Sequence, residues 1–274
     1  MTATRRAAAA TAAALLVPAL AGCSAPASGP LADVSVRVVQ YRSDIAPHRV
    51  QLEVVNDSAD DVVVRSAALV GAGWSPAPSW TDEDDPATVR AGTTVDLPAA
   101  LATASCGRRG PLGARLRLAD GTIRTVRAVD LHGTLAALHA GDCFAETAAR
   151  TATVRFTALV PHGRTAEAVL EVRAGPDAAR GVVVEQVLPT PLLSPPSGDE
   201  RWDVGRRFTA DGVLRLPVVP TRCDLHAIAE DKVGSVLPVR LRLADGRSGT
   251  VRAVAPARLK DAVLAWVVRA CGNA

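Results

Sequence analysis

The feature of this sequence that most limits its fold is a stretch of sixteen residues that occurs twice. Residues 114–129 read ARLRLADGTIRTVRAV and residues 239–254 read VRLRLADGRSGTVRAV, with twelve identities at a constant offset of 125. In each copy an alternating arm is followed by Asp-Gly and then by a second β-rich arm, which is a strong signal for a β-hairpin. The chain is therefore a duplication, and each half contains the same hairpin.

Further β-rich runs precede each hairpin in the same order. They cover residues 34–41, 50–56, 62–70 and 93–97 in the first copy, and 152–159, 168–173 and 182–187 in the second. Many short strands separated by turns predict a β-sandwich in each half. Beyond each hairpin, apolar residues recur at helical spacing, so we expect each half to end in a short helix that stops at a cysteine. The helical positions are Leu131, Leu135 and Leu138 in the first copy and Leu259, Val263 and Trp266 in the second.

The N-terminus has the order of an export signal. Arg5 and Arg6 precede an apolar run over residues 7–20, and Leu20-Ala21-Gly22-Cys23 closes it. These last four residues resemble the lipobox of bacterial lipoproteins. The resemblance implies that cleavage falls before Cys23 and that its sulfur carries a diacylglyceryl group, so that the mature protein is anchored to the cell membrane on the extracytoplasmic side. An ordinary secretory signal, in which Cys23 has no role, is the alternative.

The patterns together divide the chain into four segments. They are a lipoprotein signal peptide at 1–22, a lipidated tether at 23–31, a first β-sandwich repeat at 32–146 and a second at 151–272. The stretch LEVVNDSADDVVV, residues 52–64, resembles those of bacterial immunoglobulin-like envelope domains. We therefore expect a mainly β chain of two tandem immunoglobulin-like β-sandwich domains, each ending in a short helix.

Four cysteines remain after Cys23, with one before and one after each hairpin. An even number in an exported chain predicts two disulfides, although four cysteines allow three pairings. The symmetry of the duplication selects Cys106 with Cys143 and Cys223 with Cys271. A zinc site is the alternative, but no pair has the Cys-x2-Cys spacing. We therefore expect no bound metal and no cofactor.

The charge balance bears on possible partners. Removing residues 1–22 takes away Arg5 and Arg6 and lowers the net charge from +3 to +1. Proteins that bind nucleic acid need a concentrated positive surface, so this balance argues against such a partner. Each hairpin still carries a basic stripe, which would either meet anionic lipid headgroups and cell-wall polymers or pair with nearby carboxylates. The stripes are Arg115, Arg117 and Arg127, and Arg240, Arg242 and Arg252.

The second copy has an insertion after its leading cysteine. Its loop reads CDLHAIAEDKVGS and is eight residues longer than that of the first copy. Asp224 can cap a helical turn on which His226 and Glu230 share a face, as in a two-ligand metal half-site. The alternative is a surface turn with local charge pairs. The segment also resembles a CDxHAxAEDK pattern of uncharacterised actinobacterial lipoproteins, a resemblance that implies no mechanism.

Three tryptophans lie in Pro-rich stretches, Trp74 and Trp80 within residues 71–86 and Trp202 within residues 189–205. Exposed rings near acidic residues can bind a sugar or a peptide. The alternative is that the rings fold back over the open end of a sandwich. The acidic run at residues 82–85 lacks the alternating spacing of an EF-hand loop, and we interpret it as a solvated loop.

The sequence contains none of the Gly-x-Ser-x-Gly, His-Glu-x-x-His or P-loop motifs. The leading prediction is a membrane-anchored binding or assembly module of the cell envelope, not an enzyme, whose partner is an envelope protein or a cell-wall glycan. The alternative is an enzyme or metal-dependent protein with a site at residues 223–232 or between the domains.

Overall fold

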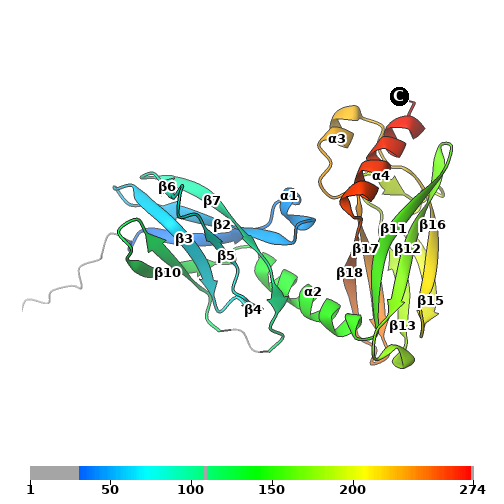
Figure 1. Cartoon of the computed structure of the whole chain (residues 1–274), viewed down its shortest axis with the longest axis horizontal. Coiled ribbons are helices and arrows are strands. Elements are labelled where there is room, and N and C mark those ends of the chain that lie inside the picture. Colours follow the sequence, from blue (N-terminus) through cyan, green and yellow to red (C-terminus); the bar gives the residue numbers. More distant parts are fainter. Residues whose placement is uncertain (1–30, 108–109, 273–274) are drawn as a thin grey trace, which may run out of the picture.

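Two β-sandwich domains joined by one helix make up the protein (Figure 1). The structure is a computed structural model that describes residues 31–107 and 110–272. The predicted signal peptide, Cys23 and nearly all of the predicted tether lie outside the described residues. Within the described ranges, no helix combines the length and the hydropathy needed to cross a bilayer.

The first domain forms one twisted sheet in the order β5-β3-β9-β10-β1-β2-β7. Its strands are β1 (Val34–Val39), β2 (Arg49–Asn56), β3 (Val62–Val70), β5 (Ser79–Thr81), β6 (Ala87–Val89), β7 (Thr93–Ala100), β9 (Gly113–Leu118) and β10 (Ile123–Val129). A separate pair consists of β4 (Trp74–Ser75) and β8 (Thr103–Ala104), and the short helix α1 (Arg42–Ile45) connects β1 to β2. The parallel pairing of β1 with β10 joins the two layers of the sandwich at one edge.

The second domain has two separate four-stranded sheets, β11-β12-β16-β14 and β15-β13-β17-β18. Its strands are β11 (Ala152–His162), β12 (Thr165–Ala174), β13 (Val182–Val187), β14 (Leu193–Ser194), β15 (Trp202–Phe208), β16 (Gly212–Pro220), β17 (Val236–Leu243) and β18 (Ser248–Val254). Its helices are the 3₁₀ turn η1 (Ala178–Arg180), α3 (Leu225–Ala229) and α4 (Ala257–Ala270).

The strand order is immunoglobulin-like in both domains. In the second, β11, β12 and β16 take the places of strands A, B and E, while β15, β13, β17 and β18 take those of C′, C, F and G. In the first, β1, β2 and β7 face β5, β3, β9 and β10 in the same order. The prediction of two tandem β-sandwiches is confirmed.

The repeated hairpins have the same register and turn. Arg117 pairs with Ile123 in the first copy, and Arg242 pairs with Ser248 in the second. Each turn places its glycine in the left-handed region, with φ of 81° at Gly121 and 85° at Gly246. A side chain is strained there, which explains why Asp-Gly occurs in both copies.

Both predicted disulfides are present, Cys106 with Cys143 and Cys223 with Cys271. Neither spans the two sheets as the disulfide of antibody domains does. Each instead ties the loop before the hairpin to the helix after it, and α4 ends directly before Cys271, as expected.

The first helix differs from the prediction. The helix α2 (Thr134–Ala149) begins after Leu131, which is 59% exposed, and it does not stop at Cys143 but continues for six residues. The expected domain end at residue 146 therefore falls inside α2. The extension exists because the last turns of α2 pack against the second domain, a tertiary contact that local sequence does not encode.

Candidate functional site

The helix α2 belongs to both hydrophobic cores. Near its start, Leu135 and Leu138 are buried in the core of the first domain. Near its end, Ala148 is 1% exposed in the core of the second domain, and Phe144 packs against the same core. One continuous helix thus fixes the position of the seam between the domains, and Figure 1 shows α2 running from the first domain to the second.

Departures from the duplication gather at this seam. Gly249 of β18 stands where the first copy has Arg124, and a Cβ atom on Gly249 would lie 2.5 Å from the ring of Phe144. The α1 segment has no counterpart in the second domain, where a short turn links β11 to β12, and α3 has none in the first. These three differences between the two copies all border the contact between the domains.

His48 links the first domain to α2 and to the second domain. Its Nε2 lies 3.0 Å from Oδ2 of Asp142 on α2, and its Nδ1 lies 3.5 Å from Nη1 of Arg252 on β18. Because a guanidinium can only donate, Nδ1 is the acceptor and Nε2 carries the proton that is donated to Asp142. The residue is held at φ 52°, in the left-handed region, a conformation that costs a non-glycine residue about 1 kcal/mol or more.

Asp142 accepts a second hydrogen bond, from Nε1 of Trp74 at 2.9 Å. Burial by itself would raise the pKa of Asp142. The hydrogen bonds from His48 and Trp74 and the positive charge of Arg252 outweigh burial, so the pKa of this carboxyl lies below its usual value. Asp142 is therefore ionised at neutral pH and holds both donors in place.

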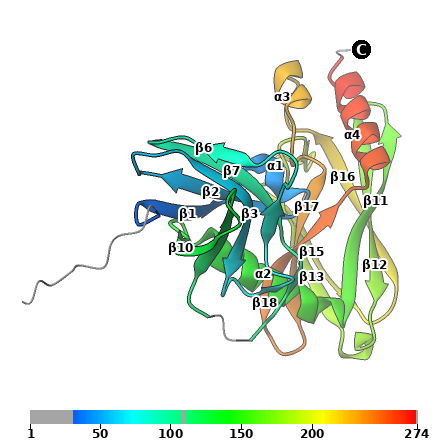
Figure 2. The same cartoon turned by 60° about the vertical axis from the view of Figure 1, so that its left-hand side comes forward.

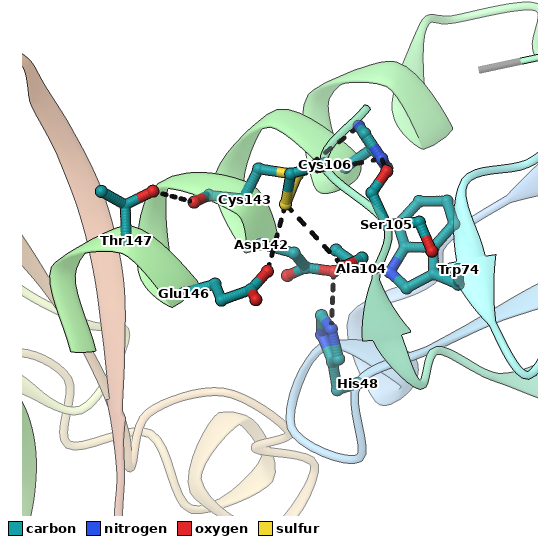
Figure 3. The surroundings of a disulfide bond; sticks show 10 residues. His48, Trp74, Ala104, Ser105, Cys106, Asp142, Cys143, Glu146 and Thr147 are labelled. Atoms are coloured by element: carbon teal, nitrogen blue, oxygen red, sulfur yellow. Dashed lines mark hydrogen bonds and ion pairs between the residues drawn. A yellow bond between two sulfur atoms is a disulfide. The ribbon is translucent and has the colours of Figure 1, made fainter. Parts of the chain in front are cut away.

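The first disulfide supports this network (Figure 3). Cys143 follows Asp142 on α2, and its bond to Cys106 anchors that turn of the helix to the loop after β8. The ring of His139 meets Trp74 edge to face at a centroid distance of 5.2 Å, and its Nε2 lies 3.1 Å from the carbonyl oxygen of Ser105. Trp74 is thus fixed on two sides, and its N–H is directed at Asp142.

A pocket of about 330 Å³ opens beside His48 and Asp142. Four parts of the fold line it: the end of α1 with the loop that follows, one face of α2, and the strands β11 and β18. Its walls are mainly small or apolar, and they include Ile45, Ala145, Ala149, Val154 and Val251. Such an apolar pocket with a few convergent polar groups is the usual form of a small-molecule site.

The insertion in the second copy forms α3 as predicted, and Asp224 caps it by accepting from the backbone N–H of His226. His226 and Glu230 share a face at 3.4 Å, but their side chains are 80% and 68% exposed. Among the residues that the structure describes, no group of three or more His, Cys, Asp or Glu is placed to hold a metal ion. Arg42 of α1 lines the same hollow as His226 and Glu230, so the insertion also borders the seam.

The tryptophan rings do not form an exposed platform. Trp74 and Trp202 are 5% and 7% exposed, and Trp80 is half-buried against the first core. Trp202 also donates from Nε1 to the carbonyl oxygen of Pro217 at 2.8 Å. Of the two alternatives, Trp74 and Trp202 follow the one in which the rings fold back onto the sandwich, because their stretches contribute strands β4 and β15.

Four of the six arginines in the basic stripes have side-chain partners, and these four separate into two groups. Arg240 and Arg242 pair with Glu185 at 3.3 and 2.7 Å, and Arg117 pairs with Glu83 at 2.7 Å. Arg252 differs, because it turns toward the seam and reaches His48 and the carbonyl oxygen of Ile45. Sequence reasoning missed His48, Asp142 and Arg252 as one site, since they lie far apart in the chain and match no motif.

Comparisons with known proteins give little further guidance. No family model matches the chain, and no curated protein matches it. Among solved structures, it is similar to the Pseudomonas aeruginosa CupB2 chaperone at 11% identity and a TM-score of 0.19, over 81% of this chain and 97% of that one. It is also similar to a DUF3823 family protein from Bacteroides ovatus at 10% identity and a TM-score of 0.22, over 81% and 98%. Scores this low carry no functional argument.

Proposed function

We propose that this protein is an extracytoplasmic lipoprotein, anchored to the cell membrane through Cys23, that works as a binding module of the cell envelope. One disulfide in each domain carries the proposal, because structural disulfides persist in oxidising compartments and are rare in the cytosol. The lipobox-like Leu20-Ala21-Gly22-Cys23 supplies the anchor in this proposal.

The seam between the domains is the binding site in this proposal. Small-molecule sites favour domain interfaces, and this interface combines a pocket, a polar network and repeat-specific residues. An envelope protein or a cell-wall glycan remains the proposed macromolecular partner, and it would contact the outer surface around the seam.

Metabolic labelling with a fatty acid tests the anchor. The full chain should be labelled and found in the membrane fraction, whereas Cys23→Ala should lose the label. Thiol alkylation before and after reduction should show the four remaining cysteines blocked in envelope material. A soluble pool with free thiols would contradict the proposal. Affinity capture from membranes with the anchor intact would then identify the macromolecular partner.

A further inference from the structure

Arg252 is the one hairpin arginine of the second copy that faces the pocket without a carboxylate partner, within the part of the chain that the structure describes. Its hydrogen bonds are long, 3.4 Å to the carbonyl oxygen of Ile45 and 3.5 Å to Nδ1 of His48, and neither acceptor is an anion. A guanidinium normally makes shorter, charge-assisted contacts with an anion. Arg252 therefore retains donors for a charged ligand group.

The rest of the pocket fits an apolar body. Gly141, Ala145 and Ala149 recur every four residues and so lie on one face of α2, where their small side chains leave room. Val154 of β11 and Val251 of β18 also line the pocket, together with Thr153 and Thr250 of the same strands. The volume of about 330 Å³ is at the lower end of the range for small-molecule sites.

We propose that the pocket binds a small amphipathic organic anion, with its carboxylate on Arg252 and its hydrocarbon part between α2 and the strands β11 and β18. Asp142 does not take the place of the ligand, because its Oδ2 already accepts from His48 and Trp74. His48 contacts Asp142 through Nε2 and Arg252 through Nδ1, and among the described residues no ion pair joins Asp142 directly to Arg252. This inference rests on the binding function proposed above and adds the chemical class of the ligand.

Calorimetry of the full-length protein in lipid nanodiscs tests the inference, with hexanoate as the probe. The matched probes are 1-hexanol, which lacks the charge, and hexylamine, which reverses it. Arg252→Gln removes the anion contact and Ala145→Leu fills the apolar part. The control is Arg127→Gln, because Arg127 occupies the equivalent position of the first copy and is exposed.

Hexanoate should bind saturably, at least tenfold more tightly than 1-hexanol. Both pocket variants should weaken hexanoate binding at least tenfold, Arg127→Gln should leave it unchanged, and Arg252→Gln should abolish the preference over 1-hexanol. Equal hexanoate binding by the wild type and Arg252→Gln would overturn the inference, as would tighter binding of hexylamine or no saturable binding. Because the comparison of probes in the wild type needs no variant, a misfolded Arg252→Gln protein would not remove the test.

Failure of the inference can be distinguished from failure of the proposed function. Fatty-acid labelling of Cys23 is measured on the same preparations. Labelled protein that ignores hexanoate would remove the ligand assignment and leave the anchor standing. Unlabelled protein that binds hexanoate would remove the anchor and leave the ligand assignment standing.

Discussion

Phe144 of α2 packs directly over Gly249 of β18, at the position where the first copy of the duplicated hairpin carries Arg124. An aromatic ring thus occupies the space that a side chain on β18 would need. The contact joins the bridging helix to the second domain, and it explains one of the four differences between the two hairpin copies.

Replacing Gly249 with alanine should destabilise the protein. The added Cβ would clash with the Phe144 ring at 2.5 to 2.8 Å, and overpacking of this kind costs about 1 to 3 kcal/mol. Urea unfolding measures the change. Gly141→Ala on α2 is the control, because a Cβ there has nothing within 4 Å and should stabilise the helix by up to about 1 kcal/mol. A change in the free energy of unfolding of the same sign in Gly249→Ala and Gly141→Ala would contradict the packing of Phe144 on Gly249.

Asp142 should make stability fall at acid pH. Its pKa in the folded protein lies below the usual value of 3.8, so the folded state releases this proton more readily than the unfolded chain. The stabilisation is therefore complete above about pH 4 and is lost as the pH falls through the lowered pKa. Asp142→Asn should be less stable than the wild type at neutral pH, and the difference in urea midpoint should shrink below pH 4. A difference in urea midpoint that stays constant down to pH 2 would argue against a lowered pKa of Asp142.

Trp74→Phe, which removes one donor, should raise the pKa of Asp142 in a carboxyl NMR titration.

Tyr41, the only tyrosine in the chain, should ionise late. Its single hydroxyl proton lies between two carboxylate acceptors, Glu53 at 2.9 Å and Asp96 at 3.1 Å. The hydrogen bond to Glu53, together with burial and Asp96, raises the pKa of Tyr41 from 10.0 to about 12. Because the folded pKa is raised, the contribution to stability is complete below pH 10 and is lost as the pH rises toward 12. Near-ultraviolet absorbance should follow this titration without interference from other tyrosines. Asp96→Asn should lower the pH midpoint of Tyr41 ionisation. Ionisation of Tyr41 near pH 10 in the native protein would refute its contacts with Glu53 and Asp96.

His226→Ala and Glu230→Ala should change little. Both side chains are mostly exposed, and isolated surface substitutions usually alter stability by less than about 0.5 kcal/mol. We expect neither zinc binding by the wild type at micromolar concentration nor a change in unfolding midpoint in either variant. Zinc uptake that disappears in both variants would instead favour the metal-dependent alternative.

The repeated hairpin made much of the fold predictable. Alternating residues place Leu116 and Leu241 in the cores, and the symmetry of the copies selects the disulfide pairs from three possibilities. Strands β5 and β15 were not predicted, because the prolines near them indicate loops.

The candidate site was less predictable than the fold. His48, Asp142 and Arg252 come from a loop, a helix and a strand in separate parts of the chain, so spacing alone does not bring them together. The extra length of α2 is equally hidden, since Phe144 and Ala148 are stabilised by the second domain. One available signal was the replacement of Arg124 by Gly249 between otherwise similar hairpins.

The shared helix also sets how the molecule responds to force. The described chain starts at the end of the first domain that points away from the second (Figures 1 and 2). Because α2 is embedded in both cores, a force applied at the start of the described chain reaches the second domain through a packed helix and not through a flexible linker. The second domain is consequently held at a fixed distance from the start of the described chain, set by the length of the first domain.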